Sequence, residues 1–185
     1  MNEILFINAC IRENSRTLEL AKHVLSKLSG NVSEIELNKL NLKPIDLDTL
    51  ELRDISNKKK DFTDSTFDLA KQFANADTIV IAAPYWDLMF PAVMKNYLET
   101  ITVNGLTFCY GNDGRPQGLC KAKRLVYVTT SGGPIIHNFG YEYVNAVSKS
   151  FFGIEKVDFV SAQCLDIYGA DVLKSLKEAK ESFTE

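Results

Sequence analysis

The sequence predicts an α/β protein built on a doubly wound parallel sheet with helices on both faces. Five short runs rich in β-branched and aliphatic residues are separated by segments whose apolar residues recur at helical spacing. Strand and helix thus alternate five times, as expected of right-handed crossovers between parallel strands. A length of 185 residues favours one domain, residues 1–185.

The strands are predicted from runs that are short and strongly apolar. Three of the five runs are almost continuously apolar, which is typical of strands buried on both faces of a parallel sheet. Five strands in a domain of this size indicate the flavodoxin-like order 2-1-3-4-5. The predicted strands are 3–8, 33–37, 78–83, 124–130 and 157–162.

The helices are predicted from apolar periodicity and from residues that favour helix starts. Ser15 is a candidate N-cap for the first helix, and Asp64 or Ser65 for the second. Pro91 suits the first turn of the third. The predicted helices are 15–28, 64–75, 91–101, 140–152 and 170–183.

Two segments fall outside this alternation. Residues 38–63 are expected to form a long, charged connection after the second strand. Residues 105–119 combine apolar alternation with the turn sequence GNDG, which indicates either a β-hairpin or a loop excursion. Long loops in compact folds are often functional, so both segments are candidates for function.

Composition excludes several classes of function. A net charge of −3 without a basic stripe argues against a nucleic-acid partner. No apolar run approaches the roughly 18 residues of a membrane span, and the first residues do not resemble a signal peptide. Four scattered cysteines and two histidines give no metal-ligand spacing. We therefore expect a cytoplasmic protein with reduced thiols and no metal.

Ligands of an open parallel sheet bind beyond the carboxyl ends of its strands, near the point where the strand order reverses. This rule selects the loops after the first, third and fourth strands. Their sequences are NACIRENSRT (8–17), PYWDLMFP (84–91) and TSGGPIIHNFG (130–140).

The first loop ends at a helix N-terminus and carries arginines and hydroxyl groups. Free backbone N–H groups, the positive end of the helix and an arginine together suit a phosphate group. Neither the GxGxxG nor the GK[ST] motif is present. The alternative is that Ser15 only caps the helix and that Arg12 and Arg16 are solvated.

The other two loops offer an aromatic surface and paired glycines. Pro84 and Pro91 stiffen a loop in which Tyr85 and Trp86 could stack on a planar cofactor; alternatively, Trp86 fills a hydrophobic gap. The glycines of TSGG allow close approach to a ligand or simply make a turn. Together the three loops would suit a flat mononucleotide such as FMN.

These residues resemble those of the FMN-dependent NAD(P)H:quinone oxidoreductases and azoreductases of flavodoxin-like fold. The resemblance covers nearly the whole chain and is most specific in VIAAPYWDLMFPAVMKNYLETITVNGLTFCY and in TSGG. It implies FMN as cofactor, NADH or NADPH as electron donor, and usually a homodimer. The residues that match cofactor-binding positions of the family are Arg12, Ser15, Arg16, Thr17, Pro84, Tyr85, Trp86, Asp87, Leu88, Thr130, Ser131, Gly132 and Gly133.

The chain departs from the family pattern in the first two loops. Ala9 and Cys10 stand where many members have serine, which removes one hydroxyl that Arg12 could replace. Asp87 stands at or beside a position where many members have a neutral Asn, and a carboxylate facing N1 of the flavin would disfavour the anionic reduced form of the ring. We therefore expect the Asp87 side chain either to accept a hydrogen bond from the flavin or to turn to solvent.

The activity implied is two-electron hydride transfer by a ping-pong cycle from NAD(P)H to a small aromatic acceptor, such as a quinone, azo or nitroaromatic compound. The cofactor carries the chemistry, so no catalytic side chain is required. Tyr110, His137 and Phe139 are candidates for the substrate-side wall. The alternatives are a flavodoxin-type electron carrier and a dimeric scaffold that has lost its cofactor.

Overall fold

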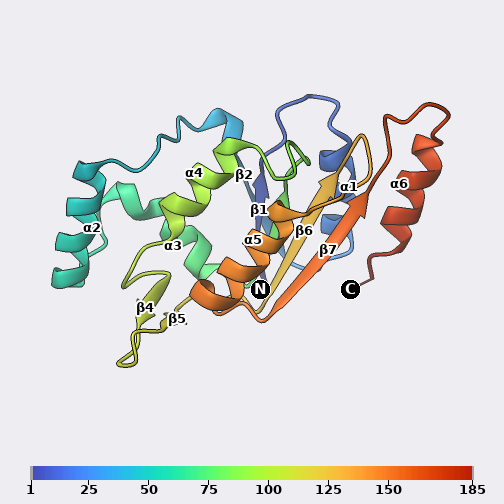
Figure 1. The fold of residues 1–185 in the computed structure, drawn as a ribbon. Helices are drawn as coiled ribbons and strands as arrows, with labels where there is room; N and C mark the ends of the chain where they lie inside the picture. Colours follow the sequence, from blue (N-terminus) through green and yellow to red (C-terminus); the bar gives the residue numbers. More distant parts are fainter. Residues whose placement is uncertain (1, 185) are drawn as a thin grey trace.

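A parallel sheet of five strands forms the centre of the protein (Figure 1). The structure is a computed structural model that describes residues 2–184. The strand order is β2-β1-β3-β6-β7, which confirms the predicted flavodoxin-like order. The strands are β1 (Glu3–Asn8), β2 (Asn31–Glu36), β3 (Thr78–Ala82), β6 (Arg124–Thr130) and β7 (Lys156–Ala162).

Helices cover both faces of the sheet and enclose two hydrophobic cores. Ile4 and Phe6 of β1 join the core beneath α1 and α6, whereas Leu5 and Ile7 join the core beneath α3, α4 and α5, because successive side chains of a strand face opposite sides. No helix within residues 2–184 is both long and apolar enough to cross a membrane. The helices are α1 (Arg16–Ser26), α3 (Asp68–Asn75), α4 (Ala92–Ile101), α5 (Phe139–Val147) and α6 (Val172–Glu181).

The helices next to the carboxyl ends of the strands begin close to the predicted residues. Ser15 caps α1, where its side chain accepts a hydrogen bond from Leu18 N–H. Pro91 is the residue before α4, and Asn138 caps α5 in the same way as Ser15 caps α1. The single turn of π-helix at Ser148–Phe152 continues α5, so the two together cover the predicted fourth helix.

The prediction for residues 33–63 is wrong in two places. The second strand runs from Asn31 to Glu36 and not over residues 33–37. It ends at Glu36 because Leu37 already starts a short 3-10 helix. The predicted connection at 38–63 contains a helix of 13 residues, α2 (Leu47–Lys59). Ser56 is its buried residue, so the helix lacks the apolar stripe that would have revealed it.

The segment 105–119 forms a hairpin at the amino ends of the strands. Its strands, β4 (Phe108–Tyr110) and β5 (Pro116–Gly118), pair antiparallel, which resolves the choice between a hairpin and a loop. The hairpin packs closely on the π-helical turn that continues α5, since a Cβ at Gly118 would lie 2.2 Å from N of Gly153, the residue that ends this turn. Figure 1 shows it at the end of the sheet opposite the strand tips.

One buried hydroxyl in α4 has no hydrogen-bond partner and predicts a gain in stability when it is removed. Tyr97 is fully buried, its hydroxyl pairs with no group in residues 2–184, and burial raises its pKa. A buried unsatisfied polar group costs about 1–3 kcal/mol. We expect Tyr97→Phe to raise the free energy of unfolding by about 1 kcal/mol in urea titrations.

The matched control for Tyr97 is Tyr141, whose hydroxyl donates a hydrogen bond to the carbonyl oxygen of Val157 at 3.2 Å. Tyr141→Phe removes that bond and should lower the free energy of unfolding by about 0.5–1.5 kcal/mol. Equal losses for the two variants would show that the Tyr97 hydroxyl is satisfied.

Candidate functional site

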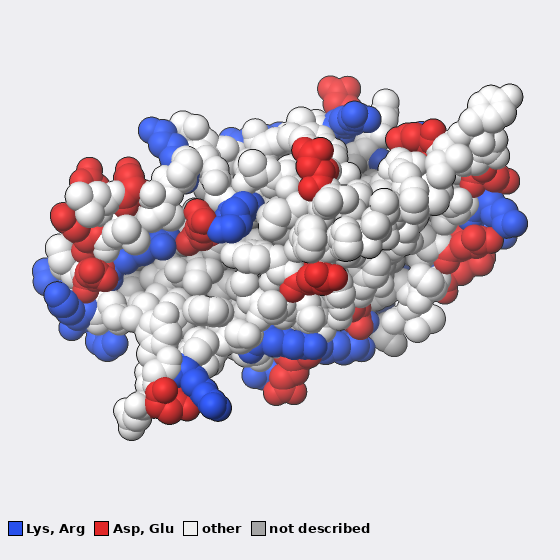
Figure 2. Space-filling model, in the orientation of Figure 1, with Lys and Arg blue, Asp and Glu red and all other residues white. Residues whose placement is uncertain are grey.

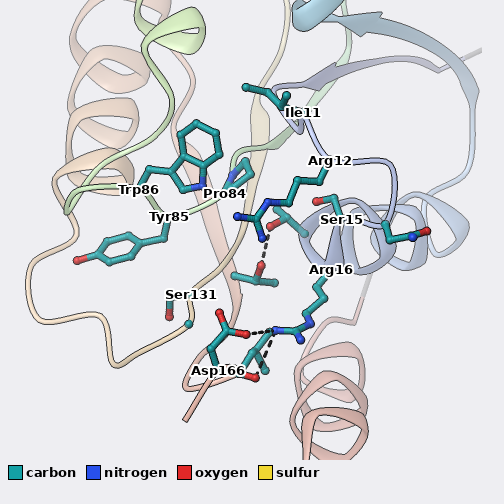
Figure 3. Close-up of a pocket in the computed structure, with 14 residues that line it drawn as sticks. Ile11, Arg12, Ser15, Arg16, Pro84, Tyr85, Trp86, Ser131 and Asp166 are labelled. Atoms are coloured by element: carbon teal, nitrogen blue, oxygen red, sulfur yellow. Dashed lines mark hydrogen bonds and ion pairs between the residues drawn. The ribbon is translucent and has the colours of Figure 1, made fainter.

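A cavity of about 370 Å³ opens at the carboxyl ends of β1, β3, β6 and β7 (Figure 3). Its size is within the range of about 300–1,000 Å³ typical of small-molecule sites. The three loops selected from the sequence all contribute to its wall. The lining residues are Ile11, Arg12, Asn14, Ser15, Arg16, Thr17, Pro84, Tyr85, Trp86, Thr130, Ser131, Gly132, Leu165 and Asp166.

The first loop and the start of α1 form the cationic side of the cavity. The backbone N–H groups of Arg16 and Thr17 donate to no group in residues 2–184, as is usual in the first turn of a helix. Arg12 is exposed and pairs with no described residue, and Figure 3 shows its side chain reaching toward the opposite wall. This side therefore presents several hydrogen-bond donors and an unpaired positive charge.

Two side chains of α1 are joined to the end of β6 and to the loop that follows β7. Arg16 Nη1 lies 2.7 Å from Asp166 Oδ1 and also donates to the carbonyl oxygen of Leu165 at 3.3 Å. The hydroxyls of Thr17 and Thr130 are 2.6 Å apart. One of these hydroxyls donates to the other, so the pair keeps one O–H free to donate to a ligand.

The opposite wall is a stiff loop of Pro84, Tyr85 and Trp86. Tyr85 N–H donates to the carbonyl oxygen of Thr130 at 3.1 Å. The Tyr85 hydroxyl donates to the carbonyl oxygen of His137 at 2.7 Å. These bonds fix the loop to the segment after β6 at two points. The Trp86 side chain is 40% exposed, so it does not fill a hydrophobic gap in the interior.

A two-residue turn at Asp87 and Leu88 reverses the chain after Trp86. Trp86 and Met89 exchange both of their backbone hydrogen bonds, at 2.9 and 2.8 Å. Asp87 and Leu88 have φ of 49° and 68°, the arrangement of a type I′ turn. Their N–H groups find no acceptor in residues 2–184. A leucine in this conformation is strained, and such strain is concentrated at functional sites.

The loop after β7 was not among the three loops selected, yet it supplies Leu165 and Asp166. It runs beside the TSGG loop: Leu165 N–H donates to Ser131 O at 3.1 Å, and Asp166 N–H donates to Gly132 O at 2.9 Å. A Cβ at Gly132 would lie 2.5 Å from Asp166 Oδ2, so a larger residue there would displace the carboxylate of Asp166. The carboxyl-end rule applied to the fifth strand would have found these residues.

Several predicted site residues lie outside this cavity. Asp87 and Leu88 form the turn at its rim. Gly133 is not a lining residue either, and a Cβ added to it would meet no atom within 4 Å. His137 and Phe139 stack on each other beside that turn, with ring centroids 5.4 Å apart. Tyr110 belongs to the hairpin at the other end of the sheet, so it cannot line the cavity of its own chain.

Cys10, one of the two residues expected to depart from the family pattern, is not among the residues that line the cavity. Its Sγ lies 3.8 Å from the carbonyl oxygen of Ala82 and is buried. Burial raises the pKa of the thiol to about 11, so it stays protonated at neutral pH. Its backbone N–H donates to Asn8 Oδ1 at 2.9 Å, and this bond shapes the start of the first loop.

Comparison with known proteins places the chain in a family. Its sequence matches the family described as Flavodoxin-like fold over residues 2–185. An FMN-dependent NADH:quinone oxidoreductase of Coprothermobacter proteolyticus is 35% identical, with 97% of this chain and 94% of that protein covered. One of Lachnoclostridium phytofermentans is 34% identical, with 98% and 96% covered. The chain belongs to the flavodoxin-like FMN-dependent NADH:quinone oxidoreductases.

Solved structures of other proteins share the fold of this chain. An azoreductase from Bacillus anthracis superposes with a TM-score of 0.83 at 23% identity, covering 98% of this chain and 96% of that one. An FMN-dependent NADH-azoreductase from Bacillus anthracis in complex with FMN gives 0.78 at 24% identity, covering 98% and 97%.

The chemistry of the cavity fits an FMN molecule. One side offers arginine, hydroxyl and helix N–H donors, which suit a phosphate group. The other side offers the rigid aromatic loop at Tyr85 and Trp86, which suits a planar ring. The two sides face each other in one cavity (Figure 3).

The strained turn predicts an unusual response to glycine. At Leu88, glycine relieves a left-handed conformation worth about 1–2 kcal/mol, which offsets the lost burial. Leu88→Gly should leave the free energy of unfolding within about 1 kcal/mol of wild type. Met89→Gly, at a position without positive φ, should lower it by about 2 kcal/mol or more. Equal losses in denaturant titrations would contradict the strain.

Proposed function

We propose that this protein is an FMN-dependent NADH:quinone oxidoreductase. The observation that carries the proposal is a single cavity with a cationic, donor-rich wall opposite a rigid aromatic wall, in a chain of this family. The named relatives match over nearly their whole length, which supports the same activity here. Quinones are the first acceptor class to test, followed by azo and nitroaromatic compounds.

The residues of the three loops divide the work of holding the cofactor. Bound FMN supplies the ability to accept a hydride from NADH and to pass it on. The first loop holds the phosphate, the Pro84–Trp86 loop packs against the ring, and the TSGG loop borders its edge. The free N–H groups of Asp87 and Leu88 supply further donors beside the ring.

Donor and acceptor are proposed to use the same open face in turn, which gives ping-pong kinetics. No described side chain in the cavity is placed as an obligatory acid or base, and hydride transfer does not need one. The rim residues His137 and Phe139 form a flat stack beside the turn and are proposed to contact the aromatic acceptor.

All four cysteines are free thiols, which supports a cytoplasmic location.

The decisive experiment is steady-state kinetics of protein reconstituted with FMN. We expect oxidation of NADH in the presence of menadione, with parallel double-reciprocal lines when both substrates are varied. Protein that binds FMN but turns over no nicotinamide donor would instead be an electron carrier of the flavodoxin type. Protein that binds no FMN would be a scaffold.

We also propose a homodimer, because apolar side chains are exposed beside the cavity. Leu88, Ile136 and Phe139 are 39%, 74% and 48% exposed, and Phe139 N–H donates to Leu88 O. Figure 2 shows few charged side chains over the central part of the face that carries α5. A second copy would cover such a surface, and only from a second copy could Tyr110 approach the cavity.

The dimer proposal predicts a single species of twice the 20.7-kDa chain mass in sedimentation velocity. Phe139→Glu should shift the protein toward the chain mass, because a carboxylate in an apolar contact is costly. Lys149→Glu, an exposed charge reversal at the far end of the same helix, is the control. A monomeric wild type at micromolar concentration would refute the proposal.

A further inference from the structure

The predicted phosphate-binding residues of the first loop and α1 fall into two groups. The side chains of Arg16 and Thr17 already have protein partners, namely Asp166 and Thr130. Arg12 has none among the described residues and points into the cavity. The two arginines of one cavity are therefore in different chemical situations.

Arg16 is held through a single nitrogen by the loop after β7. Nη1 carries two N–H groups, and its two acceptors are Asp166 Oδ1 at 2.7 Å and the carbonyl oxygen of Leu165 at 3.3 Å. The positive charge of Arg16 is paired with that carboxylate. Its net contribution to an incoming phosphate is consequently small compared with that of an unpaired arginine.

Asp166 is itself attached to the TSGG loop. Its N–H donates to Gly132 O, and its Oδ2 lies against the Gly132 backbone. The contacts thus form a continuous chain from α1 through Arg16 and Asp166 to the loop after β6. The hydroxyl pair of Thr17 and Thr130 makes a second connection between the same elements.

We propose that Arg16 and Asp166 form a brace that holds the cavity wall, and that Arg12 supplies the charge that binds the phosphate. Arg16 and Asp166 are then positioning residues: they fix the 162–166 segment and the TSGG loop against α1. This inference rests on the proposed function, because it assigns roles within the FMN site. It departs from the expectation that Arg16 is a direct phosphate ligand.

The magnitudes separate the two roles. Arg16 and Asp166 side chains are 40% and 68% exposed, and ion pairs of this kind contribute little, so losing the brace should change an affinity only about 2- to 5-fold. A charge-assisted hydrogen bond from arginine to phosphate is stronger, and its loss should change the affinity at least about 10-fold. Because riboflavin lacks the phosphate, its affinity should depend on the brace and not on Arg12.

The test compares FMN with riboflavin by flavin fluorescence titration on the full chain. Arg16→Met should raise the dissociation constants of both flavins by the same factor, about 2- to 5-fold. Asp166→Ala should weaken riboflavin equally, and the double variant should be no worse than either single one, because both remove one contact. Arg12→Met should weaken FMN at least about 10-fold and leave riboflavin unchanged.

A second measurement reports on the brace without any flavin. Amide hydrogen exchange at Leu165 and Asp166, whose N–H groups donate to the TSGG loop, should become about 2- to 5-fold faster in Arg16→Met and in Asp166→Ala. The matched control is Glu19→Gln, which breaks the Lys180–Glu19 pair between α6 and α1, an ion pair of 2.6 Å outside the cavity. It should leave both flavin affinities and these two amides unchanged.

Two results would overturn the brace. In the first, Arg16→Met weakens FMN about 10-fold or more and leaves riboflavin unchanged, which would make Arg16 a phosphate ligand. In the second, exchange at Leu165 and Asp166 is unchanged in both variants. A wild-type protein that binds neither flavin would refute the proposed function instead, and the exchange measurement would still decide whether the brace exists.

Discussion

Parallel pairing of β1, β3, β6 and β7 is the constraint on which the rest of the structure depends. Each strand pairs with its neighbour without a break in register, for example Ile7 with Ile81 and Val80 with Val126. Because all four strands point the same way, the four loops that follow them meet at one edge. Every crossover must then return along a face of the sheet, which places the helices and buries both faces.

Backbone hydrogen bonds between neighbouring loops hold this edge together, in addition to buried side chains such as Phe90 and Leu165. Beyond the last ladder pair, Tyr85 N–H donates to Thr130 O and Ser131 N–H donates to Ala162 O, which extends the strand pairing into the loops. The strained turn at Asp87 and Leu88 follows where the chain must reverse before α4 begins. Hydrogen-bonded backbone thus surrounds a cavity whose polar groups are available to bind a ligand.

Buried apolar patterns made most of the fold predictable, and their absence explains what was missed. β1 and β6 were predicted to the residue, because every interior position is apolar or threonine. α2 was missed because Ser56 alone is buried in it, so its sequence carries no stripe. Of the cavity, Asp166 was missed because it follows the fifth strand, outside the three loops selected from the sequence. Its pairing with Arg16, 150 positions earlier, leaves no local pattern.

The two buried thiols do not add charge near the cavity at neutral pH. Burial raises the pKa of Cys10 to about 11 and that of Cys120 to about 12, so both thiols are neutral at physiological pH. Arginine remains charged throughout this range. The positive charge of the cavity is therefore supplied by Arg12 and Arg16. With Asp166 already paired to Arg16, the charge left for an anion is that of Arg12.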